Sequence, residues 1–455
     1  MITVAAVAAI VLTPQPAQST RWVATVRPDV QVIKEVDPNF PLSFWAVKFK
    51  YPSEGSRLEA RLANDNVYSK MNLFSRENVR DMAVRTGALV AINADFFGND
   101  GDPLGTMLSG GEIVSEPYSP RSVAAWSPTN GLQFDSPTFS ASIEPVGAPR
   151  IRIDGINRSV RAGEVVLFTQ KGGVASSKLR CSAFLLEAKQ PLPISGSASL
   201  RLKTIVHDLT DIPVALDEAI LMVSPQRLSE VTAALYAGLT YDFRINLSGQ
   251  IDWKSVTDAI GGGPRLVKNG SVSVTRDYER FDASYNSRHP RSAIGNTANR
   301  EVVILAVDGR SSSSKGLTLD ELAKLMVKLG CVDAMNLDGG GSTTLVLGGT
   351  VVNRPSDGGL RSVANALLLH APPESQLAIG IQANTLQLKP GDITTMRVVD
   401  SAGAVVPQEQ VVWTSNGSAG WVGGDGAFRA TGAGKATVKA FARGNWAAAE
   451  VAVAP

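Results

Sequence analysis

A carboxylate, three glycines and three hydroxyls follow one another in Asp338-Gly339-Gly340-Gly341-Ser342-Thr343-Thr344. Glycines allow positive φ and let backbone N–H groups approach a ligand closely, so this loop can surround anionic oxygens with hydrogen-bond donors. Asp338 would add one fixed negative charge beside that anion. Taken alone, the loop is equally consistent with a glycine-rich turn that is capped by an aspartate.

The same order of an apolar run followed by polar residues occurs twice more. Residues 301–307 are almost continuously apolar and lead into Asp308-Gly309-Arg310, and residues 88–92 lead into Asn93-Ala94-Asp95. Short apolar runs of this kind predict buried strands, and functional side chains often follow such strands directly. Two carboxylates, Asp308 and Asp338, beside a donor-rich loop suggest acid–base or charge-stabilising work on a polar substrate.

The segment between Asp308 and Asp338 predicts the element that brings them together. Thr318 and Glu321 form a capping box, apolar residues recur at helical spacing up to Leu329, and Gly330 is placed to end the helix. The expected order is therefore strand, helix, strand. If the two strands are parallel with the usual crossover, both carboxylates leave the same edge of the sheet and lie near each other.

Cationic residues gather in two other segments. Arg288-His289-Pro290-Arg291 places three groups that are, or can become, cationic within four residues, and Asn353-Arg354 follows the Asp338 loop. Guanidinium groups bind phosphate oxygens bidentately and stay charged, so these residues suit an oxyanion or phosphate clamp. A solvated basic turn explains residues 288–291 equally well. A second glycine-rich loop covers residues 261–264.

Composition limits the function classes. With 455 residues, the chain should form two or three domains, and its formal charge of +2 gives no reason to expect a nucleic-acid or membrane partner. The three histidines argue against a histidine-rich metal site. The sequence has no HExxH pair, G-x-S-x-G elbow or complete P-loop. Cys181 and Cys331 could pair in an oxidising compartment or remain two buried thiols, and both alternatives stay open.

The two ends of the chain differ from its middle. Residues 1–20 contain an apolar run that is short for a membrane span, so we expect a signal peptide and a secreted or cell-surface protein; without a positive n-region, an apolar buried segment remains the alternative. Residues 371–375 resemble a linker. Residues 376–455 predict short, regularly spaced strands. The expected fold class is α+β: a mixed-sheet catalytic domain over 21–371 with the β-α-β unit, and a small all-β sandwich over 376–455.

Several segments, taken in chain order over roughly residues 40–370, resemble the phosphodiester glycosidase family. One mild departure is Ser292, where the family often has threonine. The C-terminal part looks like a bacterial Ig-like domain. The matching segments are Ala91-Ile92-Asn93-Ala94-Asp95-Phe96-Phe97, Gly261-Gly262-Gly263-Pro264, His289-Pro290-Arg291-Ser292-Ala293-Ile294-Gly295, Val307-Asp308-Gly309-Arg310, Gly316-Leu317-Thr318, Asn336-Leu337-Asp338-Gly339-Gly340-Gly341-Ser342-Thr343 and Val352-Asn353-Arg354-Pro355.

The resemblance implies hydrolysis of a sugar-1-phosphodiester, such as an N-acetylglucosamine-1-phosphate diester in a glycan or cell-wall polymer. Asp338 would be the main catalytic carboxylate, with Asp308 and Asp95 as partners. Calcium is a candidate cofactor through Asp95, Asp100 and Asp102, although metal dependence stays open. Two alternatives remain: a surface protein that binds a polyanionic glycan without turnover, and a phosphodiesterase that cuts the P–O bond. The expected substrate-binding residues are Asn93, His289, Arg291, Asn336, Gly340, Gly341, Ser342, Thr343, Asn353 and Arg354.

Overall fold

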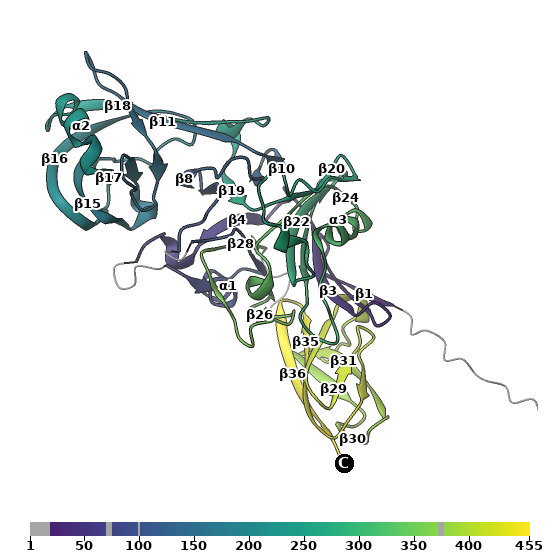
Figure 1. The fold of residues 1–455 in the computed structure, drawn as a ribbon. Helices are drawn as coiled ribbons and strands as arrows, with labels where there is room; N and C mark the ends of the chain where they lie inside the picture. Colours follow the sequence, from purple (N-terminus) through teal and green to yellow (C-terminus); the bar gives the residue numbers. More distant parts are fainter. Residues whose placement is uncertain (1–18, 70–74, 99–100, 372–376) are drawn as a thin grey trace, which may run out of the picture.

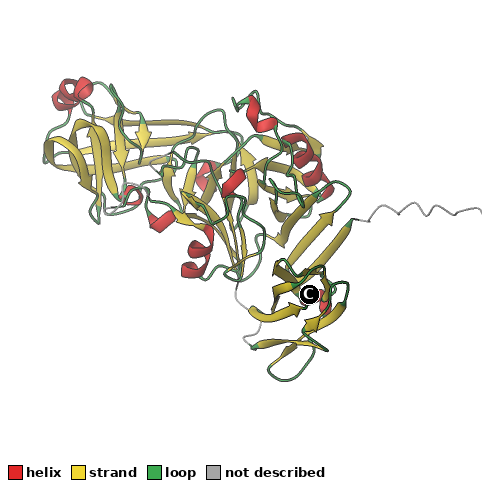
Figure 2. Cartoon of the chain, turned by 60° about the horizontal axis from the view of Figure 1, so that its bottom comes forward, coloured by secondary structure: helices red, strands yellow, loops and turns green. Residues whose placement is uncertain are grey.

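The fold is mainly β, and the expected α+β class is wrong. The computed structural model describes residues 19–69, 75–98, 101–371 and 377–455, and half of the chain is strand. Figure 2 shows strands throughout the molecule, with few helices at its surface. Within the described residues, no helix is long and apolar enough to cross a bilayer. The α-helices in those ranges are α1 (Val79–Thr86), α2 (Leu228–Ala234) and α3 (Leu319–Lys328).

The sheet that carries most of the predicted site residues has eight strands in the order β1-β2-β3-β23-β22-β24-β20-β21. Every neighbouring pair in it is antiparallel, so it is not the mixed sheet that we expected. Its strands are β1 (Thr20–Arg27), β2 (Val30–Asp37), β3 (Leu42–Lys50), β20 (Arg265–Lys268), β21 (Ser271–Val272), β22 (Arg291–Thr297), β23 (Glu301–Val307) and β24 (Cys331–Asn336).

The strand–helix–strand unit is nevertheless present as β23, α3 and β24. Both strands pair with β22, antiparallel in each case, so they run parallel to each other with β22 between them. Asp308 and Asp338 therefore follow strands that end at the same edge of the sheet. The intervening strand keeps β23 and β24 about 10 Å apart, which is twice the spacing of adjacent strands.

The apolar character of β23 follows from burial on both faces. Val303 and Leu305 pack with Leu322 and Met326 of α3, while Ile304 packs in the main core on the other face. Strands buried on both faces are typical of helix-covered parallel sheets. Here a helix covers only one face and further strands cover the other, which explains why the pattern suggested a more helical fold.

Two five-stranded sheets complete this part of the molecule. Their orders are β26-β25-β6-β28-β4 and β10-β9-β19-β7-β8, and a small pair joins β27 to β5. Strand β6 delivers Asn93 and Asp95 to the interior. The strands are β4 (Arg57–Leu62), β5 (Glu77–Asn78), β6 (Val90–Asn93), β7 (Met107–Ser109), β8 (Glu112–Ser115), β9 (Val123–Ser127), β10 (Gly131–Asp135), β19 (Asp258–Gly261), β25 (Leu345–Leu347), β26 (Thr350–Val351), β27 (Ser362–Val363) and β28 (Asn365–His370).

The middle of the chain forms an eight-stranded sheet of its own, in the order β12-β11-β18-β16-β15-β17-β14-β13. It lies at one end of the molecule and packs around a separate hydrophobic cluster (Figure 1). Buried and exposed residues alternate along β18. The strands are β11 (Thr138–Glu144), β12 (Ile151–Ile153), β13 (Gly155–Ile156), β14 (Val165–Phe168), β15 (Val174–Glu187), β16 (Gly196–Pro213), β17 (Glu218–Val223) and β18 (Thr240–Ser248).

The C-terminal part is a sandwich of two four-stranded sheets, β29-β31-β34-β33 and β30-β36-β35-β32, around its own core. Figure 1 shows it beside β3 and β26. Its assignment as an Ig-like domain over 376–455 stays a prediction, as does the 21–371 boundary. The strands are β29 (Ile379–Ala383), β30 (Gln387–Leu388), β31 (Ile393–Asp400), β32 (Val412–Gly417), β33 (Gly420–Val422), β34 (Ala427–Ala430), β35 (Gly434–Ala442) and β36 (Asn445–Val453).

Three sequence expectations fall wholly or partly outside the described residues. Most of the apolar N-terminal segment lies in the undescribed residues 1–18, the linker over 371–375 lies there from residue 372 onward, and Asp100 is also outside the described residues. The two cysteines are described, and both Cys181 and Cys331 are buried free thiols. The disulfide alternative is therefore wrong, because the two cysteines belong to separate sheets.

Candidate functional site

A cavity of about 250 Å³ lies where β24 ends and β22 begins. Six of the predicted site residues line it: Asp338, Asn336, His289, Arg291, Gly340 and Gly341. Four of the other lining residues were not singled out as site residues from the sequence: Ser284, Tyr285, Arg310 and Arg361. Sequence spacing could not select Tyr285 or Arg361: Tyr285 lies in a short 3₁₀ helix (Ala283–Asn286) without a recognisable motif, and Arg361 comes from a loop after the Asp338 segment.

Asp338 is the carboxylate of this cavity. Its backbone is fixed, because its N–H donates to the Ala94 carbonyl (2.9 Å) and its carbonyl accepts from Asn93 Nδ2 (2.5 Å). Burial raises the pKa of Asp338 to about 6, although hydrogen bonds from Ser342 and the Gly339 N–H, and the charge of Arg361, act in the opposite direction. Asp338 is therefore held rigidly and changes charge near neutral pH.

Three N–H groups of the glycine loop, which we predicted to cradle an anion, bond to carbonyl groups of the protein instead. The Gly340 N–H donates to the Pro290 carbonyl at 2.9 Å, and the N–H groups of Ser342 and Thr343 donate to carbonyls within a short 3₁₀ helix over Gly340–Ser342. The glycines instead allow close packing: Gly340 has a φ of +61°, and a Cβ on Gly341 would overlap the Asp357 carboxylate. Ser342 and Thr343 are buried.

Arg291 supplies a buried cation to the cavity. Only 3% of it is exposed, and its guanidinium donates to three carbonyls, those of Leu317 (2.9 Å), Tyr285 (2.6 Å) and Ser287 (2.7 Å). Within the described ranges, no carboxylate lies within 4.0 Å of it. Burial lowers the pKa of Arg291 to about 10, with Tyr285 acting in the opposite direction. A bound anion would compensate this buried charge.

Three more basic side chains surround Asp338. Arg361 pairs with Asp357 at 2.5 Å and donates to the Ser342 hydroxyl, while Arg310 lies 3.6 Å from Asp357 and 3.5 Å from His289 Nδ1. Burial lowers the pKa of His289, and the charges of Arg291 and Arg310 lower it further. With three arginines and one lining carboxylate, the cavity suits an anionic ligand.

Asp308 does not line this cavity. Its carboxylate accepts from the Arg354 N–H (2.7 Å), the Ser43 hydroxyl (3.1 Å) and Asn353 Nδ2 (3.5 Å). Together with Arg354 and Asn353, it lines a different cavity. The expectation of one pocket for Asp308 and Asp338 is therefore wrong. Two strands separated by a third end too far apart for their next residues to touch.

A buried polar chain links the two carboxylates. Asn353 Nδ2 donates to the Thr343 carbonyl (3.0 Å), and the Ser292 hydroxyl donates to Asn93 Oδ1 (2.8 Å) and lies 3.3 Å from the Thr343 hydroxyl, which can donate to it. Asn93 then binds the Asp338 carbonyl. These side chains are almost inaccessible to solvent. Asn93, Thr343 and Asn353, which we predicted to bind substrate, fix the backbone of the Asp338 loop, and none of them lines the Asp338 cavity.

Asp95 is sealed in the interior, with 1% of its surface exposed. Its Oδ2 accepts from the Gly105 N–H (2.7 Å) and its Oδ1 from the Phe96 N–H (2.8 Å). Each oxygen thus accepts one backbone N–H, which fixes the carboxyl group in place. Across the residues that the structure describes, no three acidic, histidine or cysteine side chains gather in a metal-binding arrangement.

The buried carboxyl of Asp95 should make stability depend on pH. Burial raises its pKa from 3.8 to about 7, with the Asp338 charge adding to the rise and the Gly105 and Phe96 N–H groups and Arg121 opposing it. The folded state therefore binds more protons than the unfolded state between these values, so stability falls as pH rises through this window. At one pKa unit per 1.36 kcal/mol, the loss is at most about 4 kcal/mol.

Urea unfolding of the wild type and Asp95→Asn at pH 4.5, 6.0 and 7.5 measures this contribution. Asparagine stays neutral, so the wild type should lose more stability than the variant as pH rises. Subtracting the two curves cancels the other titrating groups. Parallel curves would show that Asp95 does not carry the proton.

Comparison with known proteins finds a family match for part of the chain. Residues 223–370 match the phosphodiester glycosidase family model. The chain is 40% identical over 92 residues to the SPbeta prophage-derived uncharacterized protein YomE of Bacillus subtilis, which covers 20% of the chain and 14% of that protein. It is 36% identical over 102 residues to bovine N-acetylglucosamine-1-phosphodiester alpha-N-acetylglucosaminidase, covering 20% of the chain and 19% of the enzyme. The chain thus spans at most a fifth of these relatives.

Solved structures share the fold over more of the chain. A hypothetical protein from Synechocystis superimposes with a TM-score of 0.61 at 20% identity, covering 76% of this chain and 62% of that one. A protein of Burkholderia pseudomallei named as a "putative exported protein" superimposes with a TM-score of 0.59 at 19% identity, covering 72% and 74%. The segment that contributes Arg291, Asp338 and Arg361, residues 223–370, is the part of the chain that matches the phosphodiester glycosidase family model.

Proposed function

We propose that this protein hydrolyses the glycosidic C1–O bond of a sugar-1-phosphodiester in the Asp338 cavity. The observation that carries the proposal is that one half-buried carboxylate, Asp338, lines the same cavity as Arg291, Arg310 and Arg361. A phosphodiester carries one full negative charge, which these guanidinium groups can hold, while a carboxylate near C1 meets the positive charge that develops there. The match of residues 223–370 to the family supports the same reaction.

In this reaction the C1–O bond breaks and its electron pair leaves with the phosphate. A water oxygen forms the new bond to C1 and gives up a proton. Because a phosphate monoester is a stable leaving group, clamping its charge matters more than protonating it. Asp338 can attack C1, activate the water or stabilise the oxocarbenium ion, and all three roles need its ionised form.

Asn336 has an unused acceptor at this cavity. Its Nδ2 donates to the Gly263 carbonyl at 2.8 Å, whereas its buried Oδ1 has no hydrogen-bond donor within the described part of the chain. A sugar hydroxyl would supply that donor. We assign Asp308 a positioning role through Asn353 and Thr343, and Asp95 a structural one, since neither lines the cavity.

Hydrolysis in ¹⁸O water tests the proposal against its two alternatives. The substrates are N-acetylglucosamine-1-phosphodiesters, including analogues of cell-wall polymers, and the controls are buffer and Asp338→Asn. We expect the label in the sugar. Label in the phosphate would identify a phosphodiesterase, and binding without any product would identify a glycan-binding protein.

The proposed place of action is outside the cell. The resemblance of the fold to the Burkholderia protein supports export, although fold similarity alone carries no activity. Such a location would bring the cavity into contact with phosphodiester-linked glycans of a cell surface.

A further inference from the structure

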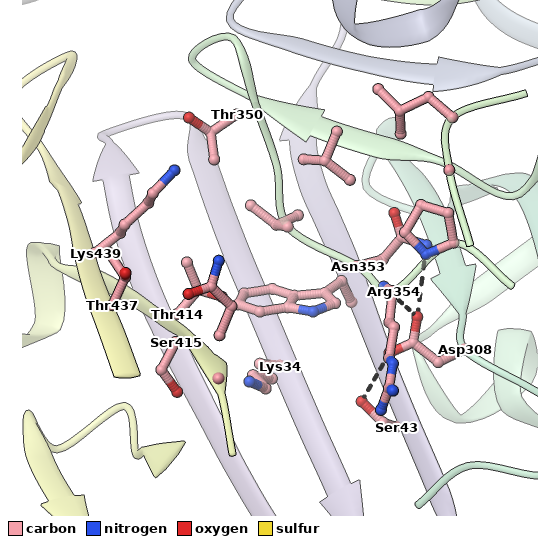
Figure 3. A pocket seen from close by; sticks show the side chains of 18 of the residues that line it. Lys34, Ser43, Asp308, Thr350, Asn353, Arg354, Thr414, Ser415, Thr437 and Lys439 are labelled. Atoms are coloured by element: carbon pink, nitrogen blue, oxygen red, sulfur yellow. Dashed lines mark hydrogen bonds between the residues drawn. The ribbon is translucent and has the colours of Figure 1, made fainter. Parts of the chain in front are cut away.

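A second cavity lies elsewhere, between the central sheet and the C-terminal sandwich. It has a volume of about 950 Å³ and is lined on one side by β2, β3 and residues 350–360, and on the other by β32 and β35. Figure 3 shows Asp308, Asn353 and Arg354 on one side of it, and Thr437 and Lys439 on the other. We call it the interdomain cleft.

Three cations of the cleft, Lys34, Arg354 and Lys439, have no carboxylate within 4.0 Å in the described ranges. The Lys34 ammonium lies 4.8 Å from the centroid of the Trp45 ring, a cation–π contact. Among the described residues that line the cleft, Asp308 is the one carboxylate, and its oxygens already accept from the Arg354 backbone N–H, the Ser43 hydroxyl and Asn353 Nδ2. The cleft is therefore cationic and has unpaired donors.

The remaining polar lining is neutral and rich in hydroxyl groups. It comes from both domains, which is the kind of surface that binds the hydroxyls of a carbohydrate through adaptable hydrogen bonds. The hydroxyl and amide side chains are Ser43, Thr350, Asn353, Thr414, Ser415, Asn416, Ser418 and Thr437.

Contacts on either side hold the two walls together. Trp446 of the sandwich donates its indole N–H to the Leu347 carbonyl at 2.9 Å, and Phe441 belongs to the main core. Trp22 and Trp421 pack with ring centroids 6.4 Å apart. The cleft is thus formed before any ligand arrives, which reduces the entropic cost of binding.

We propose that the interdomain cleft binds an anionic carbohydrate chain, with Lys34, Arg354 and Lys439 holding its phosphate or carboxylate groups and the hydroxyl side chains holding its sugars. This site is separate from the Asp338 cavity. The binding proposal does not depend on whether the Asp338 cavity hydrolyses the same glycan, because binding in the cleft involves no reaction.

Binding to the full chain carrying Asp338→Asn, which prevents turnover, tests the proposal. The probes are phosphate-linked N-acetylglucosamine oligomers, oligogalacturonate as the carboxylate source, and neutral dextran, all at low salt. We expect at least one anionic probe to bind and dextran not to bind. Binding of only one anionic probe identifies the charged group, whereas equal binding of dextran, or no binding at all, overturns the proposal.

Charge variants locate the binding. The double variant Lys34→Gln/Lys439→Gln should raise the Kd for the anionic probe that binds by about tenfold or more. Lys324→Gln is the matched control, since it removes one lysine charge from the exposed surface of α3. Because Lys34 contacts Trp45, Lys439→Gln alone serves as a second variant that leaves β2 untouched. An unchanged Kd in both cleft variants would refute the site, while the ¹⁸O assay tests the proposed reaction independently.

Discussion

Asp338→Asn should lower kcat/KM for a sugar-1-phosphodiester by about 10³-fold, within the range of losses seen for groups that act directly in acid–base catalysis. Asparagine has the same shape and can still accept from the Gly339 N–H and the Ser342 hydroxyl, so the loop should keep its conformation. It cannot carry the negative charge that meets the positive charge at C1. Steady-state kinetics with a chromogenic or coupled substrate, and thermal unfolding of both proteins, measure the effect.

Asp308→Asn is the matched control. Burial raises the pKa of both carboxylates to about 6, and both follow strands of the same sheet, but only Asp338 lines the site cavity. Asp308 reaches that cavity only through Asn353 and Thr343. Its replacement should therefore cost about tenfold or less. If Asp308→Asn cost as much activity as Asp338→Asn, the reaction would have to involve the interdomain cleft instead.

The residues near Asp338 were predictable because they are close to each other in the sequence or follow strands with a recognisable pattern. The helix α3 has the predicted capping box, with the Thr318 hydroxyl accepting from the Glu321 N–H. It also connects β23 and β24 as parallel strands, so Asp308 and Asp338 do share one edge of the sheet. The sequence pattern did not reveal that β22 lies between β23 and β24 in the sheet and so separates their ends.

Other features depend on contacts that no local pattern reveals. The predicted fold class was wrong because strands buried on both faces have the same apolar sequence pattern, whether helices or another sheet cover them. Asn93 and Thr343 looked like ligand-binding residues, but pairing with Ser292 turns them into supports of the loop. Arg361 and Tyr285 reach the cavity from loops on either side of the Asp338 segment. Such convergence is a property of tertiary structure.

Arg291→Lys should reduce kcat/KM by about 10²-fold, although it keeps the positive charge. The Arg291 guanidinium uses its planar set of donors to bind three carbonyls while it lines the cavity, and a lysine ammonium has neither the reach nor the geometry to do so. The loss of a preorganised donor for the phosphate is typically of this size. Kinetics with the same substrate, and thermal unfolding with and without inorganic phosphate, measure it.

Arg288→Lys provides the comparison for Arg291→Lys, because it lies three residues earlier and makes an exposed ion pair with Glu321 outside the cavity. We expect Arg288→Lys to keep full activity and the phosphate-dependent rise in Tm, whereas Arg291→Lys loses both. A general weakening of the loop would lower Tm equally with and without phosphate, so the phosphate-dependent part isolates anion binding. If Arg291→Lys kept the phosphate-dependent rise in Tm, the positive charge that binds the anion would have to come from Arg310 and Arg361. The buried Arg291 guanidinium would then only support residues 285–287.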